Sequence, residues 1–325
     1  MTSAITGQQY QIGAGPYRAT VTELGAGLRE LLFGDEPVIA GYDADELPPG
    51  GAGQLLAPWP NRIDGGRYDF DGTEFQLALT EPECANAIHG LTRWMAWTPV
   101  RQDGDAVVLR SGPHGQQGYP FCLQLDAEYR LDPGTGLHVA ITASNRGSHP
   151  APYGTGSHPY LTAGTPWVDD CELTLPAAFW LPTDDRGIPS GRPAAVEGTP
   201  YDFRQPRTIG ATRLDHALTG LCRDRDGRAW AHLAAGGDSG TQVGLWAGQG
   251  YRWLQVFTGD PLAPGRRRKA VAIEPMTCPP NAFVTGDDLL VLEPGEAVTH
   301  TWGVQVFNGG GRLPGDEHPE GPQHG

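Results

Sequence analysis

The 325-residue chain lacks an excess of positive charge, long apolar runs and a secretion signal. Lysine and arginine number 23 against 38 acidic residues, and the formal net charge of −15 would repel phosphate backbones and anionic membranes. No apolar run approaches the roughly 20 residues that span a bilayer. The first residues, MTSAITGQQYQIGAG, contain neither the basic nor the apolar segment of a signal peptide. We therefore expect no nucleic-acid partner, no membrane partner and a cytoplasmic location.

Cysteine is scarce, and its five positions form no pattern. They are widely spread and never arranged as a Cys-x-x-Cys pair: Cys84, Cys122, Cys171, Cys222 and Cys278. A disulfide framework or a zinc site uses paired or closely spaced cysteines, so this distribution indicates reduced thiols. We therefore expect neither a disulfide framework nor a cysteine zinc site.

Helical periodicity is also missing, because no segment of ten or more residues repeats its apolar positions every 3.6 residues. In residues 121–131, FCLQLDAEYRL, apolar and polar side chains alternate instead, and residues 137–145, LHVAITASN, repeat this after a Gly-containing turn. These two segments predict an antiparallel hairpin. With 47 glycines and 30 prolines to punctuate short strands, we expect an all-β protein with very little helix.

The same alternation predicts strands in seven further segments: EFQLAL (74–79), AVVLRSG (106–112), CELTLPA (171–177), VGLWAG (243–248), YRWLQVFTG (251–259), KAVAIEP (269–275) and VTHTWGVQVF (298–307). No internal repeat and no linker-like change in composition divides the chain. Residues 1–308 are therefore expected to form one domain of large antiparallel sheets packed face to face. Residues 309–325 are polar and rich in Gly and Pro, and we expect a disordered tail there.

Function is sought where polar residues interrupt this pattern, and APWPNRIDGGRYDFDG, residues 57–72, is the first such place. Its second half alternates and ends in Asp-Gly, which predicts a strand running into a hairpin turn. Trp59, Asn61 and Arg62 in its first half are not explained by folding alone. Asn61 and Arg62 offer many fixed donors suited to binding several oxygens, although a salt-bridged arginine under a loop would give the same pattern.

His89 is the second candidate, in ECANAIHGLTRWMAW, and Trp94 and Trp97 follow it. A neutral imidazole beside flat aromatic rings resembles the wall of a sugar site, where C–H groups pack on rings and hydroxyls meet polar groups. The alternative is a core histidine that bonds to a backbone carbonyl.

His158 is the third candidate, in APYGTGSHPYL. Gly154, Gly156 and Pro159 force the chain to turn tightly around it, and Tyr160 follows. A histidine held on such a backbone is well placed to donate a proton, since its ordinary pKa of about 6.5 permits both protonation states near neutrality. The alternative is an exposed histidine in a turn.

Glu274 is the fourth candidate, because it interrupts the apolar strand in KAVAIEPMTCPPNAF. A carboxylate at the end of such a strand must be hydrogen-bonded, paired or desolvated with a raised pKa, which makes it a candidate general base. The alternative is a surface glutamate on an edge strand. Asp215, beside His216 in TRLDHALTG, is a weaker signal because this segment could simply cap a turn.

Five motifs in order make the chain resemble the aldose 1-epimerase (galactose mutarotase-like) family: PWPNRI with the following FDG, NAIHGL, GSHPYL, LDHALTG and IEPMTCPPNAF. The resemblance covers essentially the whole chain up to the tail, and five motifs are more specific than any single one. It implies an all-β, galactose mutarotase-like β-supersandwich of large antiparallel sheets. It also implies a cleft on one sheet where a free sugar binds without metal or cofactor.

The resemblance also assigns roles to five of the candidate residues. Glu274 matches the family's catalytic base and His158 its catalytic acid, while Arg62, His89 and Asp215 match the residues that hold the sugar hydroxyls and ring oxygen. One acid and one base suffice to open a hemiacetal ring and close it as the other anomer. Aldose 1-epimerase activity on a free aldohexose or a related sugar is therefore expected.

Three further residues are predicted to contact the sugar, namely Asn61, Trp59 and Tyr160, with Trp59 to Arg62 as the floor of the cleft. The better-known galactose mutarotases have an Asn-rich stretch around the acid and a Gln shortly after the base, whereas this chain has GSHPYL and EPMTCPPNAF. This variant resembles a less characterised bacterial branch, and it leaves the preferred sugar open. A monomer and a homodimer are both compatible with the sequence.

Two alternatives concern the ligand. A hexose-6-phosphate 1-epimerase needs several converging cations, for which Arg266, Arg267, Arg268 and Lys269 could be offered, although a solvated turn explains that cluster equally. A non-catalytic carbohydrate-binding or sensor protein would have no need of both an acid and a base.

Two others concern the chemistry. Glycoside hydrolysis could use Asp215 with Glu274, but His158 would then have no role. A metal site of His89, His158 and Glu274 is disfavoured because none of them lies in a short metal-ligand motif.

Overall fold

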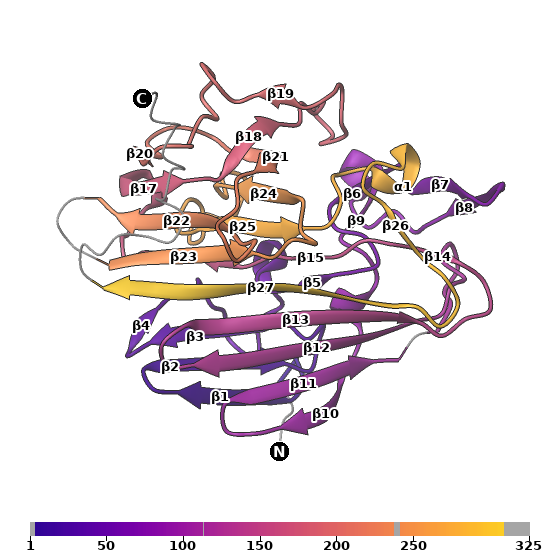
Figure 1. Ribbon diagram of the computed structural model, residues 1–325, viewed down its shortest axis with the longest axis horizontal. Helices are drawn as coiled ribbons and strands as arrows, with labels where there is room; N and C mark the ends of the chain where they lie inside the picture. Colours follow the sequence, from indigo (N-terminus) through magenta and orange to yellow (C-terminus); the bar gives the residue numbers. More distant parts are fainter. Residues whose placement is uncertain (1–3, 113, 237–240, 309–325) are drawn as a thin grey trace, which may run out of the picture.

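The computed structural model describes residues 4–112, 114–236 and 241–308, and strands make up most of its regular structure (Figure 1). Within these residues the only α-helix is α1 (Ala282–Thr285). Short 3₁₀ turns form η1 (Pro49–Gly51), η2 (Pro82–Cys84), η3 (Thr92–Trp94) and η4 (Val168–Asp170). The prediction of an all-β protein with very little helix is confirmed.

The largest sheet has nine antiparallel strands. In spatial order they are β10 (Thr98–Gln102), β11 (Ala106–Ser111), β12 (Leu123–Asp132), β13 (Gly136–Asn145), β27 (Ala297–Asn308), β23 (Thr241–Ala247), β22 (Ala229–Ala235), β17 (Cys171–Thr174) and β20 (Arg207–Thr208). β12 and β13 pair over their whole length, from Leu123 opposite Asn145 to Asp132 opposite Gly136. The predicted hairpin is confirmed.

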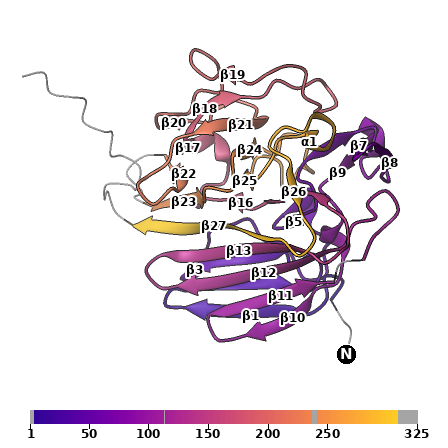
Figure 2. The ribbon, with the colours of Figure 1, turned by 45° about the vertical axis from the view of Figure 1, so that its right-hand side comes forward.

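A four-stranded sheet covers one half of this large sheet. Its strands are β1 (Gln9–Ala14), β2 (Tyr17–Thr22), β3 (Leu28–Phe33) and β4 (Glu36–Pro37). β1 and β2 contact β12, and Figure 2 shows the four-stranded sheet beside β10 to β13. The two sheets therefore pack face to face, as aligned β-sandwiches do.

An eight-stranded sheet carries the candidate site. Its order is β19 (Ala194–Ala195), β18 (Ala177–Trp180), β21 (Asp215–Leu221), β24 (Trp253–Phe257), β25 (Val271–Met276), β15 (Gly156–Ser157) and β5 (Leu55–Leu56), and β16 (Tyr160–Leu161) also pairs with β25. β5, β15 and β16 come from residues 55–161, whereas β24 and β25 come from residues 253–276, so segments distant in the sequence meet around β25.

Three two-stranded ribbons complete the structure. They are β6 (Arg62–Asp64) with β9 (Asn86–Ile88), β7 (Arg67–Phe70) with β8 (Thr73–Gln76), and β14 (Ala151–Tyr153) with β26 (Leu290–Leu292). The β7–β8 turn consists of Asp71 and Gly72, both with positive φ, as a two-residue hairpin turn requires. The predicted Asp-Gly hairpin is confirmed.

All seven other predicted segments contain strands, namely β8, β11, β17, β23, β24, β25 and β27. CELTLPA is divided: β17 ends at Thr174 and β18 begins at Ala177. Pro176 lies between them and has no N–H to donate to a ladder, which explains the break.

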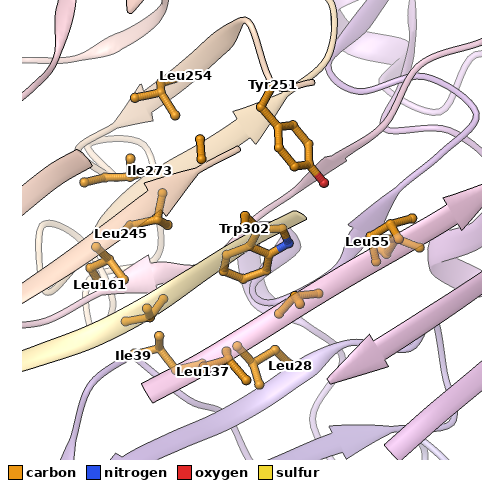
Figure 3. Close-up of a cluster of buried hydrophobic side chains, with 14 of the residues drawn as sticks. Leu28, Ile39, Leu55, Leu137, Leu161, Leu245, Tyr251, Leu254, Ile273 and Trp302 are labelled. Atoms are coloured by element: carbon orange, nitrogen blue, oxygen red, sulfur yellow. The ribbon is translucent and has the colours of Figure 1, made fainter. Parts of the chain in front are cut away.

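The three sheets share one hydrophobic cluster, which a single domain requires. Figure 3 shows members from each sheet: Leu28, Leu137, Leu245, Trp302, Leu254 and Ile273. In β25, Val271 and Ile273 enter this cluster, so strand alternation turns Ala272 and Glu274 to the other face. That outer face of the eight-stranded sheet forms the base of the pocket described below.

The tail predicted for residues 309–325 lies outside the described residues, and the domain boundary at 308 stays a prediction. Among the described residues, no helix has the length and apolar character needed to cross a membrane.

Candidate active site

Antiparallel pairing brings three polar side chains into one row on the outer face of the eight-stranded sheet. Glu274 of β25 lies directly opposite Gln255 of β24. On the other side of β25, Gly156 pairs with Met276 and Tyr160 pairs with Ala272. His158 is midway between Gly156 and Tyr160, which places it beside Glu274. Cross-strand neighbours share a face and lie within contact distance, so the register itself assembles this row.

His158 and Glu274 form a buried pair. Nε2 of His158 lies 3.3 Å from Oε1 of Glu274, and the two side chains are 5% and 2% exposed. Oε2 of Glu274 has no hydrogen-bond partner in the described structure. A buried carboxylate oxygen without a partner is costly to retain, so it marks a place where a ligand can bond. Neither an exposed turn histidine nor a surface edge glutamate fits this geometry.

Gly51 in η1 closes over His158. Its φ is +81°, and a Cβ there would lie 3.0 Å from Cδ2 of His158. Any larger residue would therefore strain the backbone and press on the imidazole.

Burial opposes charge on both members of the pair. It raises the pKa of Glu274 well above its usual range; the charge of Asp215 adds to this rise, while Arg62 opposes it. Burial also lowers the pKa of His158 to about 3. The pair therefore binds a second proton only at low pH and loses its last proton only at high pH. Between these limits it holds one proton over a broad pH range.

His89 and Asn61 lock each other in place. The backbone N–H of Asn61 donates to Nδ1 of His89 at 3.2 Å, and the backbone N–H of His89 donates to the carbonyl of Asn61 at 2.9 Å. Burial lowers the pKa of His89 well below its usual range, so the ring is neutral. Since Nδ1 accepts, the proton resides on Nε2, and His89 is an N–H donor in the pocket wall.

Arg62, the first residue of β6, is fixed by a bidentate bond to Glu81. Nε donates to Oε2 at 2.8 Å and Nη2 donates to Oε1 at 2.9 Å, with side chains 17% and 13% exposed. Burial acts to raise the pKa of Glu81, but hydrogen bonds from Arg62 and Asn86 outweigh it and hold that pKa below its usual range. Nη1 of Arg62 takes no part in this bidentate bond, and the planar guanidinium holds it in a fixed orientation.

Asp215 begins β21 and is held by its neighbour across the sheet. Nε2 of Gln255 donates to Oδ1 of Asp215 at 2.6 Å, while the buried Oε1 of Gln255 has no hydrogen-bond partner among the described residues. Gln255 therefore links Asp215 to the row that contains Glu274.

All these residues line one pocket of about 350 Å³, which is within the usual range for a small-molecule site. Its wall includes six predicted site residues, namely Asn61, Arg62, His89, His158, Asp215 and Glu274. Among the lining residues that were not predicted are Glu81, Arg93, Gln255 and Phe257. The pocket thus gathers a buried acid/base pair, several fixed N–H donors and free carboxylate oxygens.

Residues 8–305 match the sequence model of a family described as aldose 1-epimerase. The chain belongs to the aldose 1-epimerase family. An uncharacterised protein of Escherichia coli K12, YihR, is 37% identical over 291 residues, which are 90% of this chain and 91% of that protein. Human galactose mutarotase is 32% identical over 175 residues, only 52% of this chain and 50% of that enzyme.

Solved structures show the same fold. A GalM/aldose epimerase homologue from Caenorhabditis elegans superposes with a TM-score of 0.82 at 20% identity, covering 93% of this chain and 99% of that one. A galactose mutarotase-like protein from Clostridium acetobutylicum gives 0.80 at 18% identity, covering 92% and 94%. The predicted family and fold are confirmed, and the protein is an isomerase of this family.

Two predicted sugar contacts lie outside the pocket of this aldose 1-epimerase family member. Trp59 is 2% exposed and packs against Phe283, with ring centroids 5.7 Å apart. Tyr160 stacks on His158 at 4.9 Å and donates to the carbonyl of Gly50 at 2.9 Å. Both rings are enclosed by protein and neither lines the pocket, so contact of either ring with the sugar stays a prediction. Tyr160 packs on the imidazole of His158.

The two tryptophans expected to form an aromatic wall beside His89 lie outside the pocket. Trp94 is 46% exposed and Trp97 is 1% exposed, and neither lines the pocket. Phe257, next to Asp215 across the β21–β24 ladder, is the aromatic residue in the pocket wall.

The basic cluster at residues 266–269 does not reach the pocket of the epimerase. Arg266 bonds to Glu46 at 2.6 Å, Arg268 bonds to Asp169 at 2.6 Å, and the ammonium of Lys269 lies 3.5 Å above an indole ring. The cluster ties neighbouring loops together, rather than being simply a solvated turn or a phosphate site.

Sequence reasoning missed Gln255, Glu81 and Arg93. Gln255 had a usable signal, because it is a polar residue in a strand whose neighbours are apolar. Glu81 and Arg93 lie in loops without a pattern, and only their partners in space single them out. Within the described residues no three His, Cys, Asp or Glu side chains are grouped to hold a metal ion, and none of the five cysteines forms a disulfide.

Proposed function

We propose that the protein interconverts the α and β anomers of a free aldohexose or related aldose, with Glu274 as base and His158 as acid. The observation that carries this is their 3.3 Å separation in a buried pocket. Ring opening removes a proton from the anomeric hydroxyl and delivers one to the ring oxygen. Both oxygens are bonded to the same carbon, so base and acid must lie side by side. Only protons are transferred, and the proposal needs no cofactor.

The reaction uses the one-proton form of the pair with that proton on His158. Burial favours the proton on Glu274, so the ion pair forms by proton transfer from Glu274 to His158 across their 3.3 Å contact. The Glu274 carboxylate takes the proton of O1 while the His158 imidazolium protonates O5, and the C1–O5 bond breaks to give the open-chain aldehyde. After rotation about C1–C2 the carbonyl presents its other face. The O5 hydroxyl then attacks C1, His158 recovers its proton, and Glu274 returns its proton to O1. The sugar leaves as the other anomer and the pair is restored.

Arg62, His89 and Asp215 are proposed to hold the sugar through these steps. Nη1 of Arg62 and Nε2 of His89 supply N–H donors, and Asp215 accepts from a hydroxyl. Asn61 positions His89 through their reciprocal backbone bonds. Fixed groups of this kind retain the open-chain aldehyde until it recloses.

Polarimetry of freshly dissolved α-D-glucose and α-D-galactose tests the proposal. We expect the optical rotation to relax faster in proportion to protein concentration. Relaxation at the spontaneous rate for every aldose, together with a ligand-induced change in tryptophan fluorescence, would instead identify a carbohydrate-binding protein.

A hexose 6-phosphate is the second candidate substrate, and Arg93 is the observation that favours it. Its guanidinium lines the pocket, its Nε is buried without a hydrogen bond, and the described residues provide it no ion pair. A phosphate dianion prefers several converging cations, and Arg62 is already paired with Glu81, so the neutral aldose remains the first candidate.

The second candidate predicts that wild type prefers glucose 6-phosphate to glucose. That preference should fall with added salt, because salt screens the attraction between the phosphate and the guanidinium, and it should vanish in Arg93→Gln. The kcat/KM values of both sugars, measured at two ionic strengths, decide this. An equal loss for both sugars in Arg93→Gln would reject the candidate.

The pH profile of kcat/KM should be bell-shaped with a broad plateau. The alkaline limb reports loss of the pair's last proton, which the raised pKa of Glu274 governs. In Asp215→Asn the negative charge that helps to raise this pKa is gone, so the alkaline limb should move to lower pH. A limb that stays in place in this variant would contradict the assignment of that ionisation to Glu274.

The cytoplasm stays the predicted location, and none of the five cysteines forms a disulfide, as is usual for cytoplasmic proteins. Whether the protein acts as a monomer or a homodimer also stays a prediction.

A further inference from the structure

A tight turn between β18 and β19, residues 184–188, lies against Arg62 although none of its residues lines the pocket. Oδ1 of Asp184 accepts from the backbone N–H groups of Arg186 and Ile188, each at 2.9 Å. The N–H of Gly187 donates to the carbonyl of Asp184 at 3.0 Å. These bonds close the turn on itself, so its shape does not depend on its neighbours.

Arg186 anchors this turn to the segment that carries the pocket wall. Its Nε donates to the carbonyl of Cys84 at 2.8 Å, and its Nη2 donates to Oδ1 of Asp64 at 2.7 Å and to Oδ1 of Asn86 at 3.2 Å. Nδ2 of Asn86 returns a bond to the carbonyl of Arg186 at 2.9 Å. Residues about 100 positions apart in the sequence are therefore cross-linked by several hydrogen bonds.

Asn86 connects the anchored turn to Arg62 through Glu81. It is fully buried, and its Nδ2 also donates to Oε2 of Glu81 at 3.0 Å. The same Oε2 accepts from Nε of Arg62 at 2.8 Å. A continuous chain of bonds thus runs from Arg186 through Asn86 and Glu81 to the guanidinium in the pocket.

Gly187 completes the support from a second direction. Its φ is +74°, and a Cβ at this position would lie 2.6 Å from Nη1 and 2.9 Å from Cζ of Arg62. The bare backbone therefore packs directly on the guanidinium. Glycine is required here both for the backbone conformation and for the close approach.

We propose that residues 184–188 are a positioning element for Arg62, with Arg186 and Gly187 fixing where the guanidinium points. The inference rests on the proposed function for its catalytic consequence, because Arg62 is there assigned to hold the sugar. The physical claim is that Arg62 is held by the turn on one side and by Glu81 on the other. Neither Arg186 nor Gly187 lines the pocket, so both are positioning residues.

The first test reads Arg62 directly and needs no activity. In protein labelled with ¹⁵N-arginine, the Nε–H signal of Arg62 is assigned by its loss in Arg62→Lys, and its exchange with solvent is measured. We expect slow exchange in wild type and much faster exchange in Gly187→Ala and Arg186→Ala. The control is Gly198→Ala, which introduces the same backbone strain at φ +72° with nothing within 4 Å of the new Cβ. Unchanged exchange in both test variants would overturn the inference.

The second test is a double-mutant cycle on anomer exchange. Gly187→Ala should lower kcat/KM by about tenfold or more in the wild-type background, because small misplacements of binding groups are costly. In the Arg62→Gln background it should have no further effect. A general structural defect would lower kcat/KM by the same factor in both backgrounds, and this result would contradict the inference. Absence of activity in wild type would reject the proposed function, while the Nε–H measurement would still decide the role of the turn.

Discussion

Replacement of Glu274 by glutamine is expected to lower kcat for anomer exchange by a factor on the order of 10² to 10⁴, the range found for loss of a general base. Glutamine has nearly the same size but cannot take the anomeric proton. Sugar affinity should change little, because the pocket's other groups are untouched. Turnover is measured by polarimetry and affinity by calorimetric titration.

The Glu274→Gln protein is also expected to fold normally. Burial raises the pKa of Glu274 in the folded protein, so its carboxyl favours the folded state only at pH values where it is protonated there. This contribution is lost as pH rises through the raised pKa. Glutamine does not titrate, so at alkaline pH the variant should unfold at a temperature equal to or above that of wild type.

Asp288→Asn is the matched control for Glu274→Gln. Its carboxylate is also partly buried, and Oδ2 accepts from Nε1 of Trp253 at 2.8 Å, but it does not line the pocket. We expect near wild-type turnover from this variant. Wild-type turnover by Glu274→Gln would remove Glu274 from the mechanism.

Replacement of His158 by glutamine is expected to lower kcat by a factor on the order of 10² or more, because the ring oxygen then lacks its proton donor. The loss should affect every sugar that the enzyme turns over, and the bell-shaped pH profile should disappear with the coupled pair. Rates across the pH range for wild type and variant provide the measurement.

His300→Gln is the matched control for the histidine. His300 is 5% exposed, close to the 4% of His158, and burial lowers its pKa to about 4. It lies outside the pocket. Equal losses in both variants would show that His158→Gln acts through packing rather than through proton transfer.

The strands could be predicted from the sequence because their alternation is a local property. The hairpin of β12 and β13 and the strand that carries Glu274 both followed from two-residue periodicity. The 3.3 Å contact between His158 and Glu274 could not be predicted this way, since it depends on β15 and β16 pairing with β25. Only the resemblance to a family put the two residues in one site.

The features of the site that could not be predicted from the sequence have a common physical origin. Trp59 is an aromatic residue beside polar neighbours, and the sequence around it does not show that its ring is buried against Phe283. Conversely, the importance of Glu81 and Gln255 comes from holding Arg62 and Asp215 across loops and strands, and the sequence does not show these partners. Burial and remote partners are properties of the folded chain.

The most direct test of the central claim is two-dimensional exchange NMR of the wild-type protein with equilibrium mixtures of glucose, galactose, other aldoses and C6-substituted analogues. The claim predicts cross-peaks between the α- and β-anomer signals of at least one sugar. They should appear at mixing times where the sugar alone shows none, with intensity that grows with protein concentration. Binding seen as line broadening, without such cross-peaks for any sugar, would contradict it.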